Sequence, residues 1–403
     1  MTPELLRLIA AQICLHAAMT GMRLAAPLLA LQQGYSAATV GVLLALFALT
    51  QVFLALPAGR FADRHGLRAP LLIAVVAAVS GAALAAIWPV LPVLGLAALL
   101  TGGATGIAII ALQRHVGRAA GSPAQLKQVF SWLAISPAAA NFVGPFAVGM
   151  LIDHAGLVAG DLVGYRAAFV LMALLPLACW ALVRGVEELP PVRRPAGSPR
   201  PRAMDLLAEP MFRRLLFINW LQSSSWDVHT FVLPLLGHER GLSASVIGSI
   251  LGAFAVAAAA IRVLLPLFSS RVSERGVITT SNIVTALVFA VYPLTTSALG
   301  MGACSVVLGL ALGAVQPMVM SLLHQITPPA RHGEALGLRL MTLNASSVAM
   351  PMLFGAAGAL IGVAGVFWVV GGVVATGTRA VWGLKVPPEA EVEAEAQAST
   401  STP

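Results

Sequence analysis

The chain has 403 residues, of which 58% are hydrophobic and only 10% are charged, and its formal net charge is +8. A soluble protein of this length needs a charged shell around its core, and too few charged residues are present to build one. The composition, with a mean hydropathy of +0.89, therefore excludes a soluble globular protein and indicates a protein embedded in a lipid bilayer.

Twelve apolar stretches are each long enough to cross the hydrocarbon layer as a helix, which takes about 20 residues. Lipid offers no hydrogen-bond partners to the backbone, so a spanning segment must be a helix or part of a closed barrel. These stretches are too long and too uniformly apolar for barrel strands. The predicted spans, in chain order, are residues 8–31, 38–57, 69–88, 93–113, 128–151, 165–184, 215–236, 244–265, 277–297, 299–323, 335–360 and 362–381.

Two segments of the chain repeat one another at a distance of 207 residues. Residues 27–49 and 234–256 are identical at ten of 23 positions, including Pro27 with Pro234 and Gly34 with Gly241. Each copy reads as an apolar helix, a short turn with Gly and an N-capping Ser, and a second apolar helix. We therefore predict an all-α membrane protein with twelve transmembrane helices in two pseudo-symmetric six-helix bundles.

The long hydrophilic connection after the sixth span separates these bundles. The N-terminal bundle is predicted to cover residues 1–184, a cytoplasmic linker rich in Pro and Arg residues 185–212, and the C-terminal bundle residues 213–385. The acidic segment 386–403 has no apolar periodicity and is predicted to be disordered.

The basic residues set the predicted orientation. With the N-terminus inside, the cytoplasmic loops hold nine basic residues and the outer loops only Arg166 and Arg240, which follows the positive-inside rule and places both termini in the cytoplasm. The positive net charge is thus a topology signal, and we expect no nucleic-acid partner. The nine cytoplasmic residues are Arg60, Arg64, Arg68, Arg114, Arg118, Lys127, Arg271, Arg275 and Arg331.

Motifs for metal, nucleotide or enzymatic chemistry are missing from the sequence. The three cysteines lie inside predicted spans without a CxxC or Cys/His ligand spacing, so we expect no metal site. The chain has no GxxxxGK[ST] phosphate loop, and we expect no cofactor and no ATP-driven step. A polytopic membrane enzyme would need clustered acids, bases or ligands at the membrane surface, and the sequence shows none.

The loop between the second and third spans carries a recognisable motif. Residues 59–68 read GRFADRHGLR and resemble the GxLaDrxGrr signature of the major facilitator superfamily. Weaker matches are SSRVSERG at 269–276 and GYR at 164–166, the latter similar to the GWR of that family. The resemblance covers nearly the whole chain. It implies a monomeric secondary transporter that moves a small molecule by alternating access, which we expect in the inner membrane of a bacterium.

The same motif predicts a gate. Gly59 and Gly66 permit a tight turn, Arg64 and Arg68 anchor the loop at the cytoplasmic surface, and Asp63 can face the positive N-terminal end of a helix. By resemblance to the family, that helix is the eleventh span. The alternative is that the charges of this loop only fix the topology.

One acidic residue of the sixteen, Asp227, lies deep within a predicted span. It belongs to a polar helix face that recurs at i+3 and i+4 spacing and should therefore line water or protein. The members of this face are Asn219, Gln222, Ser223, Trp226, Asp227 and Thr230.

A carboxylate at this depth is expensive to keep charged, so Asp227 is the candidate for exchanging a proton with the coupling gradient. The alternatives are a permanent ion pair with Arg23 or a hydrogen bond within the bundle. His16 and His229 could join a proton relay or serve as neutral hydrogen-bonding residues. The substrate-binding candidates are Arg23, Trp226, Gln222, Asn219, Gln316 and Asn141, although the amides are equally suited to holding helices together.

The fifth predicted span carries a pattern that bears on the direction of transport. Residues 140–149 resemble the gxxxGPxxGG pattern of proton antiporters that export drugs, with Gly144 and Pro145 matching, and small residues there would let the fifth and eighth helices pack closely. The arginine of the antiporter pattern on the fourth helix is missing, since residues 92–111 carry no charge. Proton-coupled export is favoured. Import of an organic anion or metabolite with protons, a channel, and a non-transporting sensor on the same fold remain open.

Overall fold

The computed structural model describes residues 2–35, 37–159, 161–189, 204–242, 244–268 and 271–384. Several sequence predictions concern residues outside these ranges. They include the N-capping residues Ser36 and Ser243, most of the linker, at 190–203, and the acidic tail at 386–403.

The described residues form helices and no strand, which confirms the all-α membrane fold. The longer helices, in chain order, are α1 (Pro3–Gln32), α2 (Ala37–His65), α3 (Arg68–Ile87), α4 (Leu91–Ala119), α5 (Pro123–Leu133), α6 (Ile135–Ala159), α7 (Asp161–Val183), α9 (Pro210–Glu239), α10 (Ala244–Phe268), α11 (Glu274–Val291), α12 (Ala298–Ile326) and α13 (His332–Trp382). The short ones are α8 (Asp205–Ala208) and the 3₁₀ turns η1 (Tyr292–Leu294) and η2 (Pro329–Arg331).

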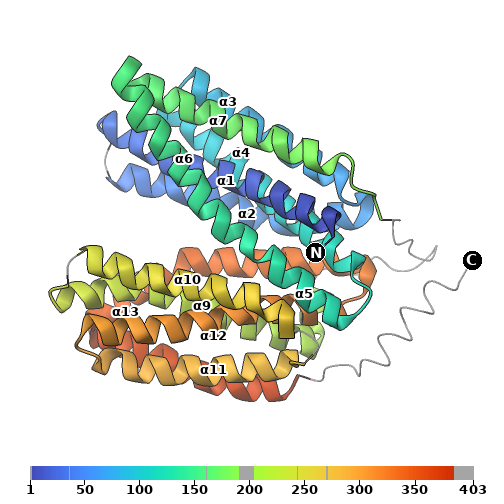
Figure 1. The fold of residues 1–403 in the computed structure, drawn as a ribbon, viewed down its shortest axis with the longest axis vertical. Helices are drawn as coiled ribbons and strands as arrows, with labels where there is room; N and C mark the ends of the chain where they lie inside the picture. The colour runs from blue at the N-terminus through green and yellow to red at the C-terminus, as the bar shows by residue number, and fades with distance from the viewer. Residues whose placement is uncertain are drawn as a thin grey trace, which may run out of the picture. The chain divides into compact units, whose positions relative to one another are not determined.

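The helices form two compact units. Unit 1 comprises residues 1–119, 136–199 and 329–344, and unit 2 comprises residues 120–135, 200–328 and 345–403. Each unit thus contains a short segment from the other half of the sequence, namely the start of α13 in unit 1 and α5 in unit 2. In unit 1, α3 packs against both α4 and α7, and α1 against α7 (Figure 1). In unit 2, α12 packs against α10 and α11.

Ten segments of the described chain are long and apolar enough to span a membrane. They do not include α9, where polar residues interrupt the apolar sequence, or the part of α13 before residue 360. Together with these two, the helices correspond to the twelve spans predicted from the sequence.

The structure interrupts one predicted span and bends the chain between two others, each for a clear physical reason. The fifth span is divided into α5 and α6 at Ala134, three residues before Pro137. Proline has no N–H to donate to the carbonyl of Leu133, four residues earlier, so a continuous helix is interrupted there. The last two spans form the single run α13, which bends at Gly362, where φ is 76°.

The internal repeat is visible in the backbone. Gly34 (φ 84°) and Gly241 (φ 70°) adopt the left-handed conformation two residues after the ends of α1 and α9. Side chains with a Cβ rarely adopt this conformation, so a glycine is required at both equivalent turns. The offset of 207 residues found in the sequence therefore relates equivalent structural positions.

Close helix packing repeats with the same offset. A Cβ atom at Gly102 of α4 would overlap the carbonyl oxygen of Phe47 of α2, and one at Gly309 of α12 would overlap that of Phe254 of α10. Glycine lets each pair of backbones approach, as small residues commonly do between membrane helices. The contacts between α2 and α4 and between α10 and α12 are therefore equivalent packing sites in the two units.

Replacement of Gly309 by alanine should destabilise unit 2, because the new methyl group must displace the backbone of Phe254. Overpacking of this kind costs about 1–3 kcal/mol. We expect the Tm of the purified protein to fall by several degrees. Gly302→Ala, on the same helix, is the control. No atom lies within 4 Å of its added Cβ, so alanine should leave the Tm unchanged or raise it. Equal effects of the two substitutions would contradict the packing argument.

Candidate functional site

The loop motif of the first half brings two helices into backbone contact. Gly59 of α2 and Gly333, at the start of α13, lie so close that a Cβ on either would overlap the carbonyl oxygen of the other. Both residues belong to unit 1. Gly59 lies inside α2, so the prediction that it permits a tight turn was wrong, and this glycine instead allows the first turn of α13 to approach α2.

The carboxylate of Asp63 lies at the N-terminal end of α13. The backbone N–H of Gly333 donates to Oδ1 at 2.8 Å, and that of Glu334 donates to Oδ2 at 3.0 Å. These N–H groups have no partner within their own helix, and the helix dipole favours a negative charge beside them. The contact between Asp63 and this helix, expected from the family resemblance, is present.

A buried arginine completes the surroundings of Asp63. Arg114 of α4 donates from Nε to Oδ1 at 2.7 Å and from Nη2 to the Asp63 carbonyl oxygen at 3.2 Å. The side chains of Arg114 and Asp63 are only 2% and 6% exposed. A buried charge is tolerated when it is paired and fully hydrogen-bonded, and here both carboxylate oxygens have donors. The pattern of basic residues predicts only a topological role for Arg114 and does not indicate this contact.

Glu334 forms a second ion-pair cluster next to Asp63. Its Oε1 accepts from Arg60 Nε and its Oε2 from Arg331 Nε, each at 2.8 Å. Arg60 comes from the loop motif, whereas Arg331 and Glu334 flank the start of α13. The Arg60–Glu334 ion pair therefore adds a second polar connection between α2 and α13, next to the Asp63 contact.

The other motif residues hold the loop to the end of α7. Gly66 has φ 75°, and the Glu188 carboxylate accepts from the N–H of Leu67 at 2.6 Å and of Arg68 at 3.2 Å. Arg68 Nη2 donates to the Val186 carbonyl oxygen at 2.7 Å. Glu188 thus caps α3, which has no capping side chain of its own. Glu188 falls within the predicted linker, where the sequence does not indicate this contact. Arg64 is exposed, as expected for a surface anchor.

A comparable cluster lies in unit 2, where the weaker motif occurs. Glu274, the first residue of α11, accepts hydrogen bonds at Oε1 from Ser321 and Gln325, each at 2.9 Å. Lys127 of α5 lies 3.9 Å from its Oε2 and donates to the Val272 carbonyl oxygen at 3.0 Å. This pairing was not predicted. The repeat did mark Lys127 as a position of interest. Lys127 and Glu334 are 207 residues apart, so charged side chains stand at equivalent positions near the starts of two equivalent helices.

Gly144 and Pro145 lie within α6. A Cβ at Gly144 would overlap the carbonyl oxygen of Ala17 on α1, and Thr20 of α1 donates its hydroxyl to the Ala140 carbonyl oxygen at 2.9 Å. The sequence pattern predicts that these small residues let the fifth and eighth helices pack closely. Within unit 1, Gly144 serves the close approach of α6 to α1.

The polar face of α9 is present in unit 2. Asn219 and Gln222 are buried, Trp226 and Asp227 are half-buried, and Thr230 is exposed. The Asp227 Oδ2 atom is buried and has no hydrogen-bond partner in the part of the chain that the structure describes. Asp227 thus differs from Asp63, whose carboxylate oxygens both accept hydrogen bonds.

The neighbours of this face show which candidate residues have structural contacts. Gln222 donates its amide to the Asn282 side chain, between α9 and α11. Trp226 packs edge-on against Phe254, with ring centroids 4.5 Å apart, and the Arg262 guanidinium lies 5.6 Å from its ring centroid, within cation–π range. Arg262 also donates to the Ala134 carbonyl oxygen at 3.0 Å. It was not among the predicted site residues.

The candidate histidines have different environments. His229 is fully buried in unit 2, where it forms a hydrogen bond with Ser305 Oγ at 2.9 Å and stacks on Phe254. It lies two residues after Asp227, so the two side chains leave α9 in different directions. His16 of α1 is half-buried, and its Nδ1 has no hydrogen-bond partner among the described residues.

The remaining candidates are divided between the units. Arg23 of α1 and Asn141 of α6 are exposed in unit 1, and Gln316 of α12 is half-buried in unit 2. The structure thus groups Asn219, Gln222, Trp226 and Asp227 on α9, and places His16 and Arg23 together on α1. That the two groups form one site, with Arg23 near Asp227, stays a prediction.

Comparison with known proteins identifies the family. The family model of the Major Facilitator Superfamily matches residues 8–220 and 215–402. No curated protein matches the chain at a significant level. Solved structures similar in fold include the human organic anion transporter MFSD10 (TETRAN), with a TM-score of 0.74 and 18% identity over 94% of this chain and 100% of the other.

Two further solved structures have the same fold. A bacterial homologue of the iron transporter ferroportin, in an outward-facing state, has a TM-score of 0.68 and 18% identity over 98% of this chain and 100% of the other. The proton:xylose symporter XylE, bound to 6-bromo-6-deoxy-D-glucose, has a TM-score of 0.69 and 14% identity over 96% and 98%. Since the family model matches nearly the whole sequence, the chain belongs to the Major Facilitator Superfamily, a family of transporters rather than enzymes.

Proposed function

We propose that this chain is a proton-coupled secondary active transporter that exports a small organic molecule by alternating access. The observation that carries the proton coupling is Asp227, an acid in a spanning helix whose Oδ2 is buried without a hydrogen-bond partner among the described residues. An unpaired charge in an apolar environment is costly, and binding a proton removes that cost. Asp227 is therefore suited to take up and release the coupling proton.

The Asp63 cluster supplies the proposed gate. Its hydrogen bonds to the first turn of α13 and to Arg114 hold α2, α4 and α13 together. In alternating access, such a contact forms in one state and breaks in the other. Hydrogen bonds to a charged group contribute about 1.5–3 kcal/mol each, enough to bias a two-state equilibrium by tenfold or more.

The direction of transport rests on residues 140–149, whose GP-containing pattern is similar to that of exporting antiporters. Small residues in this pattern allow close helix packing, and Gly144 makes such a close contact with α1. Trp226, with Arg262 beside its ring, offers an aromatic surface to an organic substrate. We place the protein as a monomer in the inner membrane of a bacterium, with both termini in the cytoplasm.

A second candidate function is proton-coupled import of an organic anion. The observation that favours it is Arg23, an exposed cation within the spanning helix α1 that forms no side-chain hydrogen bond or ion pair with the described residues. A ligand screen by thermal shift at two pH values, followed by transport of the hits in proteoliposomes, separates the two functions. An anion that accumulates together with protons would support import, and a compound expelled against a proton influx would support export.

Asp227→Asn should uncouple transport from the proton gradient, because the amide cannot exchange a proton. We expect counterflow of the identified substrate to persist, while accumulation driven by a pH gradient falls to the level without a gradient. Ser225→Ala is the control, since the Ser225 hydroxyl is occupied by the Leu221 carbonyl oxygen on another side of α9. Gradient-driven accumulation by the Asp227→Asn protein would refute the coupling role.

Asp63→Asn should weaken the gate, because the neutral amide loses the charge that binds Arg114 and the first turn of α13. We expect a cysteine at position 335, where the native alanine is fully buried, to react with a maleimide at least about tenfold faster in this background. The measurement uses a protein whose own three cysteines are replaced by serine. Glu187→Gln, a change at an exposed acid of the same unit, should leave the rate unchanged. An unchanged rate in Asp63→Asn itself would show that Asp63 does not hold this contact closed.

A further inference from the structure

A groove of about 510 Å³ lies in unit 2 among helices α10, α11 and α12. Its walls are mainly aliphatic, with Ile261 and Leu265 from α10, Val277 and Val284 from α11, and Val307 and Leu310 from α12. This groove is distinct from the polar face of α9. It therefore belongs to a part of the protein to which the proposed transport function assigns no role.

The polar groups on the groove wall are largely satisfied by the protein itself. The Ser281 hydroxyl donates to the Ala311 carbonyl oxygen at 2.8 Å, and Ser273 Oγ accepts from the Gly276 N–H at 3.1 Å as the N-cap of α11. A ligand in the groove would meet mostly hydrocarbon. All three helices are apolar enough to span a membrane, and Val307 and Leu310 are exposed. In a bilayer, lipid can therefore reach this surface.

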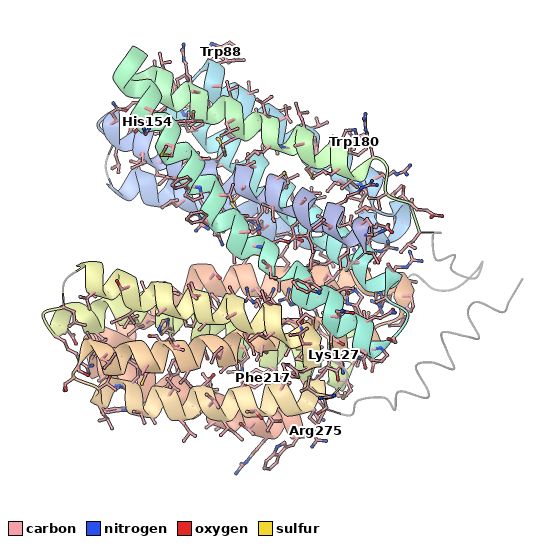
Figure 2. The ribbon with its side chains drawn as sticks, viewed as in Figure 1. Trp88, Lys127, His154, Trp180, Phe217 and Arg275 are labelled. Carbon is pink, nitrogen blue, oxygen red and sulfur yellow. The ribbon has the colours of Figure 1, made fainter. Side chains whose placement is uncertain are left out.

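Two arginines flank the end of the groove. The wall includes Val272, Ser273 and Gly276, and Arg271 and Arg275 lie within this same short segment. Both guanidinium groups are exposed, and neither forms an ion pair or side-chain hydrogen bond with the described residues. Figure 2 shows Arg275 at the end of α11. A positive charge at the rim of a lipid-facing apolar groove is complementary to an anionic headgroup above an acyl chain.

The neighbouring acid does not cancel this charge. Glu274 is buried, and its carboxylate accepts hydrogen bonds from Ser321 and Gln325 with Lys127 nearby. The Glu274 charge is thus balanced by groups inside unit 2. The N-terminal end of α11 adds a favourable dipole for an anion at the same place.

A second groove in unit 1 provides a contrast. It measures about 380 Å³, lies between α2 and α4, and is lined by apolar residues such as Val42, Leu46 and Leu96. The chain segments around it, residues 33–46 and 86–100, contain no charged residue. Both grooves thus have apolar walls, but only the groove of unit 2 has a pair of arginines close to it in the sequence.

We propose that the groove among α10, α11 and α12 binds one chain of an anionic phospholipid, whose phosphate is held by Arg271 and Arg275. The acyl chain covers the apolar wall, and the headgroup lies at the end of α11. The proposal concerns a lipid site and does not depend on the identity or direction of the transported substrate.

Native mass spectrometry of the full chain can count retained lipids after equilibration with phosphatidylglycerol or phosphatidylcholine of identical acyl chains. We expect the wild-type protein to retain phosphatidylglycerol in preference to phosphatidylcholine. The double variant Arg271→Gln with Arg275→Gln should bind phosphatidylglycerol roughly tenfold more weakly or worse, because each arginine near a membrane surface contributes about a factor of five. Ala311→Phe, which fills the groove, should remove the retained copy of either lipid.

The matched control is Arg213→Gln with Arg379→Gln, which removes the same charge from exposed arginines of unit 2 that do not line the groove. It should keep the preference for phosphatidylglycerol. Thermal melts of all variants establish that each is folded. If the Arg271 and Arg275 double variant keeps the wild-type preference, or if the control loses it to the same extent, the proposed site is wrong. Retention of both lipids by a folded Ala311→Phe protein would exclude the groove as the place where the acyl chain binds.

Discussion

The burial of the Asp63 carboxylate is the constraint on which the contact of α2, α4 and α13 in unit 1 depends. A carboxylate removed from water must find donors for both oxygens, and Asp63 finds them on two different helices, α4 and α13. The backbone donors are within reach only because Gly59 and Gly333 let α2 and α13 approach without a Cβ between them. The two glycines, the Asp63 carboxylate and the N-terminus of α13 therefore depend on one another. Removal of any one of them leaves a buried polar group without a hydrogen-bond partner.

The two units show how one packing solution can carry different chemistry. The glycine contacts Gly102–Phe47 and Gly309–Phe254 occupy equivalent positions, so the helix pairs α2–α4 and α10–α12 approach in the same way. The charged clusters beside these helix pairs are not equivalent. Unit 1 places an aspartate against an arginine and a helix terminus, whereas unit 2 places Glu274 against Lys127, Ser321 and Gln325. The two units thus share a packing contact and differ in the charged groups beside it.

The fold was predictable because it depends on local properties of the sequence. Apolar length identifies the spans, the repeat gives their grouping, and Gly34 and Gly241 mark equivalent turns. The loop motif also predicted correctly that Asp63 meets a helix N-terminus. Side-chain pairs between distant elements were not predictable, since hydrophobic periodicity contains no information about them. Arg114 resembled a topology signal and Glu188 a linker residue, although the structure gives both a specific partner. The division of the fifth span followed from Pro137, whose missing N–H a hydropathy pattern does not register.

The contrast between Asp63 and Asp227 separates two uses of the same side chain. Three groups donate to the carboxylate of Asp63, and these donors stabilise its charged form, so proton binding would break contacts that hold helices together. Asp227 has no such donors at Oδ2 within the described chain, so a change in its charge disturbs few structural contacts. A protein that must cycle between two states needs both kinds of residue, a charge that fixes one state and a charge that can change without unfolding it. The sequence distinguishes them by the loop motif and by depth in the membrane, whereas the hydrogen bonds around each carboxylate give the physical reason for assigning the gate to Asp63 and the proton to Asp227.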